Sequence, residues 1–289
     1  MASSFINNNL HQAKSDQSQP SVDAFFRARS GYWRDVYQED NNSFLPSYFR
    51  ERRSLVLALI DRLGLPERAN ILEVGCGAGL TAIAMAKRGY AVDAVDTVEA
   101  MLDLTRQAAR DAGVDGLVKT ILGSVIETNL PPQRFELAAA AGVLPWLDHP
   151  AEALREINRV LKPSGHVVLT AANRWCLNRM TDPVRLPGLR EARQKVEDAL
   201  KKRNLLTLSQ PRFHEHSIRQ IDELLLRTGF RKVHGMTIGF GPFTFFNQRL
   251  LSDRLGIKVH RRLQALADRQ FPGLRSGGIE YVVVAAKPA

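Results

Sequence analysis

Short apolar runs alternate along the chain with longer segments whose apolar residues recur at helical spacing. The runs that indicate buried strands are residues 71–74, 91–95, 117–122, 135–140, 166–171, 232–238 and 280–286. Helical spacing and stop signals predict helices over residues 47–63, 80–88, 98–112, 151–161 and 217–227, and one or two shorter helices over 23–38. Strands separated by helices predict an α/β fold with a mostly parallel sheet, helices on both faces and ligands at the carboxyl ends of the strands.

The first of these strands ends in a glycine-rich turn. Glycines stand at every second position, Gly75, Gly77 and Gly79, and a helix begins at Leu80. Glycine permits positive φ and a close approach of the backbone to a ligand. The spacing differs from the dinucleotide-binding G-x-G-x-x-G turn, whose third glycine would stand at Leu80. Glu73 precedes the turn, where a carboxylate disfavours a pyrophosphate and suits an ammonium group. Asp96 follows about twenty residues later, at the end of the next strand, where a carboxylate can bind ribose hydroxyls.

The stretch from Leu72 to Gly79, together with Asp96, resembles the first motifs of class I S-adenosylmethionine-dependent methyltransferases. The resemblance is to the small-molecule type found in ubiquinone biosynthesis, and it covers residues 68–172 closely and 217–287 more loosely. It implies a Rossmann-like sheet of seven strands, the last of them antiparallel, and S-adenosyl-L-methionine as cofactor. It does not cover residues 1–45, 173–216 or 240–275.

The resemblance also implies roles for single residues around the cofactor. The three glycines make room for the methionine moiety, Glu73 lies beneath its ammonium group and Asp96 holds the ribose. Four more positions complete the predicted site: Thr97 and Met101 flank the adenine, Val125 contacts it through its backbone, and Ala140 marks the end of the fourth strand beside the methionine moiety. Ser124 stands where the family usually carries an acidic residue for the adenine amine, so we expect a neutral and weaker hydrogen bond there.

The rest of the chain divides around this core. Residues 1–22 are rich in Ser, Asn and Gln, which predicts a disordered tail, and residues 23–66 form N-terminal helices. The aromatic residues Tyr32, Trp33 and Tyr37 are candidates for a lid over the cleft, or simply pack on the core. Residues 67–289 form the cofactor-binding domain, with helical cap insertions over 173–216 and 240–275. These caps combine aromatic and basic residues, which suits an apolar acceptor with an anionic group or contact with a membrane surface; solvated basic faces are the alternative.

Catalytic candidates are fewer. Family members that methylate phenols often carry a histidine just after the fourth strand, whereas Val143 to Leu147 hold none and His149 comes later. Histidine is the side chain whose pKa is most readily tuned for accepting a proton near neutral pH, so His214 and His149 are candidate bases. Tyr37 is the third catalytic candidate. His216 precedes Ser217, a candidate helix N-cap, which favours a local structural role.

Composition narrows the choice of function. The formal net charge is +10, from 40 Lys and Arg against 30 Asp and Glu, and favours anionic partners. No apolar run approaches the roughly eighteen residues of a membrane span, the start lacks signal-peptide features, and two cysteines suggest neither disulfides nor a metal site, so we expect a cytoplasmic protein.

The expected reaction is methyl transfer to a small-molecule acceptor, foremost O-methylation of an apolar or anionic metabolite. C-methylation of a quinone or isoprenoid-like lipid precursor is the alternative. RNA methylation is disfavoured because no RNA-binding appendage is recognisable, and a non-catalytic binder because the glycines, Glu73 and Asp96 are intact. The acceptor atom and the oligomeric state stay open.

Overall fold

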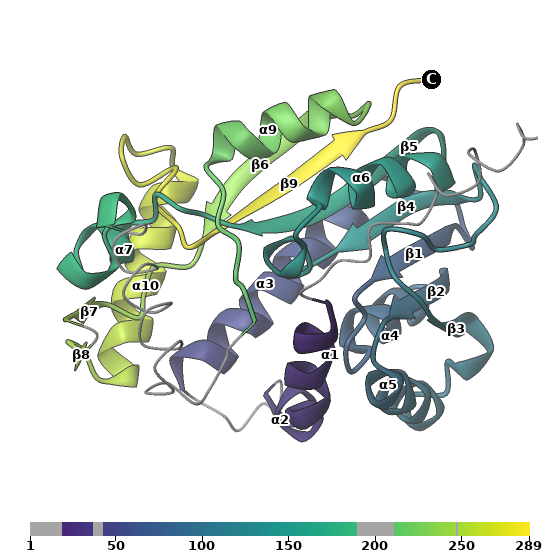
Figure 1. Ribbon diagram of the computed structural model, residues 1–289, viewed down its shortest axis with the longest axis horizontal. Coiled ribbons are helices and arrows are strands. Elements are labelled where there is room, and N and C mark those ends of the chain that lie inside the picture. Colours follow the sequence, from purple (N-terminus) through teal and green to yellow (C-terminus); the bar gives the residue numbers. More distant parts are fainter. Residues whose placement is uncertain (1–18, 37–42, 190–210, 247) are drawn as a thin grey trace, which may run out of the picture.

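A computed structural model describes residues 19–36, 43–189, 211–246 and 248–289 (Figure 1). Its centre is a seven-stranded sheet in the order β3-β2-β1-β4-β5-β9-β6. The strands are β1 (Asn70–Val74), β2 (Ala91–Asp96), β3 (Val118–Leu122), β4 (Phe135–Ala140), β5 (Leu161–Ala172), β6 (Arg231–Ile238) and β9 (Glu280–Ala286). The first five pair in parallel, and β9 is inserted antiparallel between β5 and β6. The predicted Rossmann-like sheet with an antiparallel last strand is therefore confirmed.

Helices cover both faces of the sheet (Figure 1). Successive strand residues such as Ile71 and Leu72 point to opposite faces and are both fully buried, as expected for a parallel sheet between two helical layers. One face packs against α6 (Pro150–Val160) and α9 (Ile218–Arg227), and the other against α3 (Phe44–Asp61), α4 (Leu80–Ala86) and α5 (Glu99–Asp111). Both apolar cores fix the carboxyl edge of the sheet, where a ligand would bind.

The remaining elements gather around that edge, except for one 3-10 turn that directly precedes β3. They are α1 (Gln19–Ala28), α2 (Ser30–Asp35), α7 (Leu177–Met180), α10 (Asp253–Asp268), the short hairpin of β7 (Thr244–Phe245) and β8 (Gln248–Arg249), and the 3-10 turns η1 (Asp115–Leu117), η2 (Leu144–Trp146), η3 (Pro183–Arg185) and η4 (Pro187–Leu189). Within the described residues, no helix is long and apolar enough to cross a membrane.

Several predicted boundaries shift. The helix expected from residue 47 begins at Phe44, because Pro46 is tolerated in a first turn, where its missing N–H is not needed. Strand β5 begins at Leu161 instead of His166, since Leu161 pairs with Phe135 ahead of an irregularity in the register. Residues 19–22, assigned to the tail, already belong to α1, and the rest of that tail lies outside the described residues. Ser217 caps α9 through a capping box with Gln220, as predicted.

The two predicted cap insertions differ. Helix α10 packs on α3: the buried His260 ring accepts from the backbone N–H of Phe240 and contacts Phe44 and Glu51. Residues 240–275 are thus anchored to the fold. In the other insertion, residues 190–210 lie outside the described part of the chain, and only its two ends can be placed.

Candidate active site

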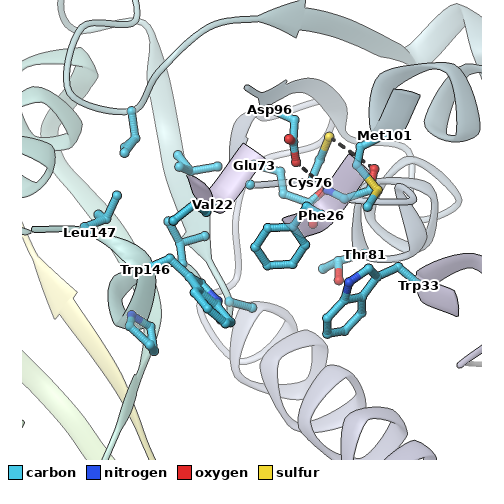
Figure 2. Close-up of a pocket in the computed structure, with 18 of the residues that line it drawn as sticks. Val22, Phe26, Trp33, Glu73, Cys76, Thr81, Asp96, Met101, Trp146 and Leu147 are labelled. Carbon is cyan, nitrogen blue, oxygen red and sulfur yellow. Dashed lines mark hydrogen bonds between the residues drawn. The ribbon is translucent and has the colours of Figure 1, made fainter. Parts of the chain in front are cut away.

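A cleft of about 380 Å³ lies at the carboxyl edge of the sheet, over the ends of β1, β2 and β4. Figure 2 shows Glu73, Cys76 and Asp96 on one side of it, with Phe26 between Trp146 and Trp33 opposite them. Most of the predicted cofactor residues line this cleft: Glu73, Gly75, Gly77, Asp96, Thr97, Met101, Ser124 and Val125. The sequence pattern and the cavity therefore coincide.

The glycine turn has the backbone that only glycine adopts readily. Gly75, Gly77 and Gly79 all have positive φ, at 63°, 55° and 78°. A Cβ on Gly75 would come within 2.6 Å of Val143, and one on Gly79 within 2.7 Å of Thr105. A Cβ on Gly77 would meet no atom within 4 Å. Gly77 is therefore needed for its backbone conformation alone, and the space above it is open to a ligand.

Asp96 is fixed at the end of β2 by two backbone donors. Gly77 N–H donates to Oδ2 at 2.9 Å, and Val98 N–H donates to Oδ1 at 3.0 Å. Burial raises the pKa of the Asp96 carboxyl, while these backbone hydrogen bonds oppose the rise. The result is a preoriented carboxylate that joins the glycine turn to the start of α5 and lines the cleft, where the sequence predicts a contact with ribose.

Glu73 is the more unusual carboxylate. Its side chain is 5% exposed, and its Oε2 atom has no hydrogen-bond partner. Burial raises the pKa of Glu73 to about 8, and the nearby Asp96 adds to the rise, while the Ala82 backbone and the Thr81 hydroxyl lower it. A buried carboxylate with an unsatisfied oxygen is costly unless a ligand supplies a donor or a positive charge. The site therefore favours a cationic group next to Glu73.

The part of the cleft where the sequence predicts contacts with adenine has apolar walls and one hydroxyl group. Met101 is 1% exposed and Val125 6%, and both line the cleft. Ser124 also lines it, and its Oγ accepts from the backbone N–H of Ile126 at 3.3 Å. Ala140 is fully buried in the core behind the wall, which its neighbours Ala141 and Gly142 form. Ala140, predicted beside the methionine moiety, is thus not in the lining of the cleft, whereas the two residues that follow it are.

Helix α1 closes one side of the cleft. Thr97 Oγ1 donates to Asp23 Oδ1 at 2.7 Å, and Gln19 Nε2 donates to the same oxygen at 2.6 Å. Val22 and Phe26 line the cleft from this helix, and the Phe26 ring packs edge-on against Trp146 with centroids 5.2 Å apart. Trp33 of α2 lines it too, while Tyr37 lies outside the described residues. Of the predicted lid residues, Trp33 thus lines the cleft and the exposed Tyr32 does not, while Phe26 of α1 joins Trp33 there without having been predicted.

The other end of the cleft carries residues that the sequence did not single out. Its walls are aromatic, from Phe49, Trp146 and Phe213, and Arg52, Arg53 and Arg179 reach it from α3 and α7. Arg179 pairs with Glu215 at 2.5 Å. At the floor, Glu280 accepts from Tyr48, Thr170 and Arg52. No motif marks these residues, because they meet only through the fold.

The two predicted histidines lie outside the cleft lining. His214 Nε2 bonds to Asp148 Oδ1 at 2.7 Å, and only its neighbour Phe213 reaches the cavity. His149 is the residue before α6, and its side chain makes no capping bond there. Neither histidine is placed to meet a ligand in the cleft. In the described part of the chain, no three His, Cys, Asp or Glu side chains cluster so that they could hold a metal.

Comparison with known proteins shows which protein family the residues of this cleft resemble. Residues 72–169 match the family described as "Methyltransferase domain", a span that includes the glycine turn, Asp96 and Ser124. The chain contains a methyltransferase domain. The family resemblance inferred from the sequence is therefore confirmed for the part of the chain that forms the cofactor side of the cleft.

Relatives extend this picture. The ubiquinone biosynthesis O-methyltransferase of Pseudomonas paraeruginosa is 33% identical over 114 residues, which are 39% of this chain and 48% of the relative. The chain thus spans about half the length of the curated relatives it matches. The methyltransferase domain and the elements around it share their fold with the [4+2]-cyclase SpnF, at TM-score 0.62, 20% identity and coverage of 94% and 97% of the two chains. The 1,6-didemethyltoxoflavin-N1-methyltransferase of Burkholderia thailandensis gives TM-score 0.56, 16% identity and coverage of 96% and 92%.

Proposed function

We propose that this protein transfers a methyl group from S-adenosyl-L-methionine to a small-molecule acceptor. The observation that carries the proposal is the unpartnered Glu73 Oε2, buried in the cleft beside the open glycine turn. S-adenosylmethionine offers a cationic ammonium group for this oxygen and a ribose for Asp96. A dinucleotide would instead bring a pyrophosphate, which two neighbouring carboxylates repel.

The protein contributes mainly position. When bound, the cofactor supplies a methyl group already activated by the sulfonium, so the residues of the chain need to align it with the acceptor and exclude water. Glu73 and the glycine turn would hold the methionine end, and Asp96 the ribose. Thr97, Met101, Ser124 and Val125 would enclose the adenine. Phe26, Trp33 and Trp146 cover the cleft and would keep water from the reacting atoms.

The acceptor end supports an apolar or anionic metabolite. Its walls are aromatic, and three arginines there, Arg52, Arg53 and Arg179, outnumber the single carboxylate Glu280. The matched relatives are named O-methyltransferases, which favours oxygen as the methylated atom, with carbon in a quinone or isoprenoid-like precursor as the second candidate. The shared fold of a [4+2]-cyclase shows that this architecture alone does not fix the reaction, so the test has to measure transfer itself.

The proposal is tested by incubating the full chain with methyl-labelled S-adenosylmethionine and a cell extract from its source. We expect label in small molecules, in either the organic or the aqueous low-molecular-mass pool, and none without the protein. The variant Asp96→Ala, which loses the ribose contact, should transfer far less label at low cofactor concentration. Label that enters only RNA, or label that never leaves the cofactor, contradicts the proposal.

A further inference from the structure

A buried carboxylate lies at the acceptor end of the cleft, apart from the residues assigned to the cofactor. Glu280 is the first residue of β9, opposite Ala172 of β5, and its side chain lines the cavity at 6% exposure. Tyr48 and Thr170 donate their hydroxyls to its two oxygens, and Arg52 pairs with it at 3.3 Å. Three donors from α3 and β5 thus hold one carboxylate in a fixed orientation.

This cluster adjoins the place where the methyl group would be presented. Gly142 N–H donates to Thr170 Oγ1 at 2.8 Å, and a Cβ on Gly142 would lie 3.0 Å from the Arg52 guanidinium. The next residue, Val143, packs so closely on Gly75 that a Cβ there would clash. The loop after β4 therefore touches the glycine turn with one residue and the Glu280 cluster with the one before it.

Other groups in the described cleft lining are less suited to accept a proton from an acceptor. Glu73 and Asp96 belong to the cofactor end, and the arginines of the acceptor end have no proton-accepting atom. The Cys76 thiol faces Thr105 and the backbone of Gly77, within the glycine turn. His214 and His149 do not line the cavity. Glu280, with Tyr48 bonded to it, is left as the basic group beside the acceptor.

We propose that Glu280 binds the acceptor through an O–H or N–H group and takes up its proton as the methyl group is transferred. The acceptor is then a hydroxyl- or amine-bearing molecule with an apolar or aromatic body. In this step the bond between the acceptor atom and the methyl carbon forms while the sulfur–methyl bond breaks, its electron pair staying on sulfur. The acceptor proton moves to Glu280 and from there to solvent. Tyr48, Thr170 and Arg52 are positioning residues, which hold the carboxylate in its orientation at the cleft. This inference rests on the proposed methyl transfer.

The test compares three variants of the full chain. Glu280→Gln keeps the shape and removes the base, and Tyr48→Phe keeps the ring and removes one donor. Glu156→Gln is the matched control, because Glu156 also accepts from a threonine and an arginine but lies away from the cleft. Each protein is given methyl-labelled S-adenosylmethionine and the low-molecular-mass fraction of a cell extract from pH 6 to 9. Affinity for S-adenosylhomocysteine is measured alongside.

We expect Glu280→Gln to lower the transfer rate at pH 7 by about 100-fold or more, the scale of general base catalysis, while S-adenosylhomocysteine affinity changes little. Its remaining rate should rise about tenfold per pH unit, because only acceptor that has already ionised reacts. Tyr48→Phe should lower the transfer rate less than Glu280→Gln does and leave S-adenosylhomocysteine affinity unchanged, since the carboxylate loses one positioning donor but keeps Thr170 and Arg52. Glu156→Gln should match the wild type.

The outcomes separate the two claims. A wild-type protein that transfers no label defeats the proposed function, and this inference with it. A wild type that transfers label while Glu280→Gln does so equally fast, with the same pH profile, overturns the role of Glu280 alone. A product methylated on carbon also overturns it. Should Glu280→Gln lose S-adenosylhomocysteine binding, the transfer rate of Tyr48→Phe decides: a rate equal to that of the wild type rejects the inference.

Discussion

Individual carboxylates determine which ligand groups the cleft can bind. Asp96 is the carboxylate whose orientation is fixed by backbone donors. Both of its oxygens are oriented by backbone donors, Gly77 and Val98, at the mouth of the cavity. We expect Asp96→Ala to weaken binding of S-adenosylhomocysteine by about 1.5–3 kcal/mol, the range for hydrogen bonds to a charged group. Isothermal titration calorimetry checks this, with Asp103→Ala on the exposed side of α5 as control. Equal affinities for Asp96→Ala and the wild type would remove the ribose assignment.

Glu73 predicts a pH dependence. Burial, chiefly, raises its pKa to about 8 in the empty cleft, so near pH 7 the carboxyl is mostly protonated. Binding an ammonium group requires the ionised form, and a proton must leave when ligand enters. Affinity for S-adenosylhomocysteine should therefore increase between pH 6 and 8, by at most about tenfold per pH unit. Glu73→Gln should bind more weakly and lose this slope. Calorimetry in two buffers of different ionisation enthalpy also counts the released protons; zero release at pH 7 contradicts the assignment.

Ser124 predicts a gain of affinity. It lines the cleft where the resemblance implies a contact to the adenine amine, and its hydroxyl already accepts from Ile126 N–H. Ser124→Asp should tighten S-adenosylhomocysteine binding through a charge-assisted hydrogen bond, whereas Ser124→Ala should loosen it by about 0.5–1.5 kcal/mol. The difference between these two variants is the measurement, because both change the local turn. If both bind like the wild type, Ser124 has no part in the site.

At the scale of single residues, the sequence located members of the cleft lining where neighbours along the chain determine their positions. Glu73 and Asp96 stand at the ends of two consecutive strands, and the three glycines follow the first of them. The glycine spacing predicts the positive φ values that the turn adopts. Glu280, Tyr48 and Arg52 carry no such signal, since more than 220 positions separate Glu280 from its partners on α3. His214 and His149 were chosen on residue type alone, and the fold leaves both outside the cleft lining. Their catalytic roles, and that of Tyr37, stay predictions without a contact to support them.

Helix α1 is the element whose role can be tested most directly. Asp23 links it to Thr97, the residue after Asp96, and Phe26 packs on Trp146 across the cleft. Asp23→Ala should loosen this side of the cleft and speed dissociation of S-adenosylhomocysteine. The expected increase in the rate is about 2- to 10-fold, which corresponds to the net free energy of one typical hydrogen bond. Asp23→Asn keeps the acceptor oxygen for Thr97 and should lie closer to the wild type. Arg27→Ala, on the exposed side of α1, is the control.

Stopped-flow tryptophan fluorescence measures these dissociation rates, because Trp33 and Trp146 both line the cleft. Identical rates in Asp23→Ala and Arg27→Ala would show that α1 does not retain the ligand.

Elements also show where patterning fails. The basic, amphipathic sequence of α10 is compatible with two arrangements, a cap over the acceptor or a helix packed on a neighbouring helix. Its packing against α3 shows instead in contacts of His260 with Phe44 and Glu51, and in the Phe44 N–H that donates to Asp253. No residue from 240–275 is among the described residues that line the cleft, and Phe245 and Phe246 are exposed. The predicted role of residues 240–275 as a cap over the acceptor therefore finds no support among the described residues, whereas Arg179 and Phe213 bring the ends of the other insertion to the cavity.

For the whole molecule, sequence periodicity was enough to predict the parallel part of the sheet. Its inner strands, such as β1 and β4, are short apolar runs buried on both faces, whereas the edge strand β3 is only partly buried, and alternation with helices fixes the direction of the strands. The antiparallel direction of β9 followed from the family resemblance. Its insertion between β5 and β6 was not predicted, because pairing partners leave no mark in the pattern of a strand buried on both faces.

The central claim is that the cleft at the edge of this sheet is a site for S-adenosylmethionine and not for a dinucleotide. Calorimetric titration of the full chain at pH 8 with S-adenosylhomocysteine, and in parallel with NADH, tests it most directly. Glu73 and Asp96 predict saturable one-to-one binding of S-adenosylhomocysteine and, because they repel a pyrophosphate, binding of NADH that is at least about 100-fold weaker, or some 2.7 kcal/mol. NADH binding as tight as that of S-adenosylhomocysteine, or no binding of either, would contradict the account.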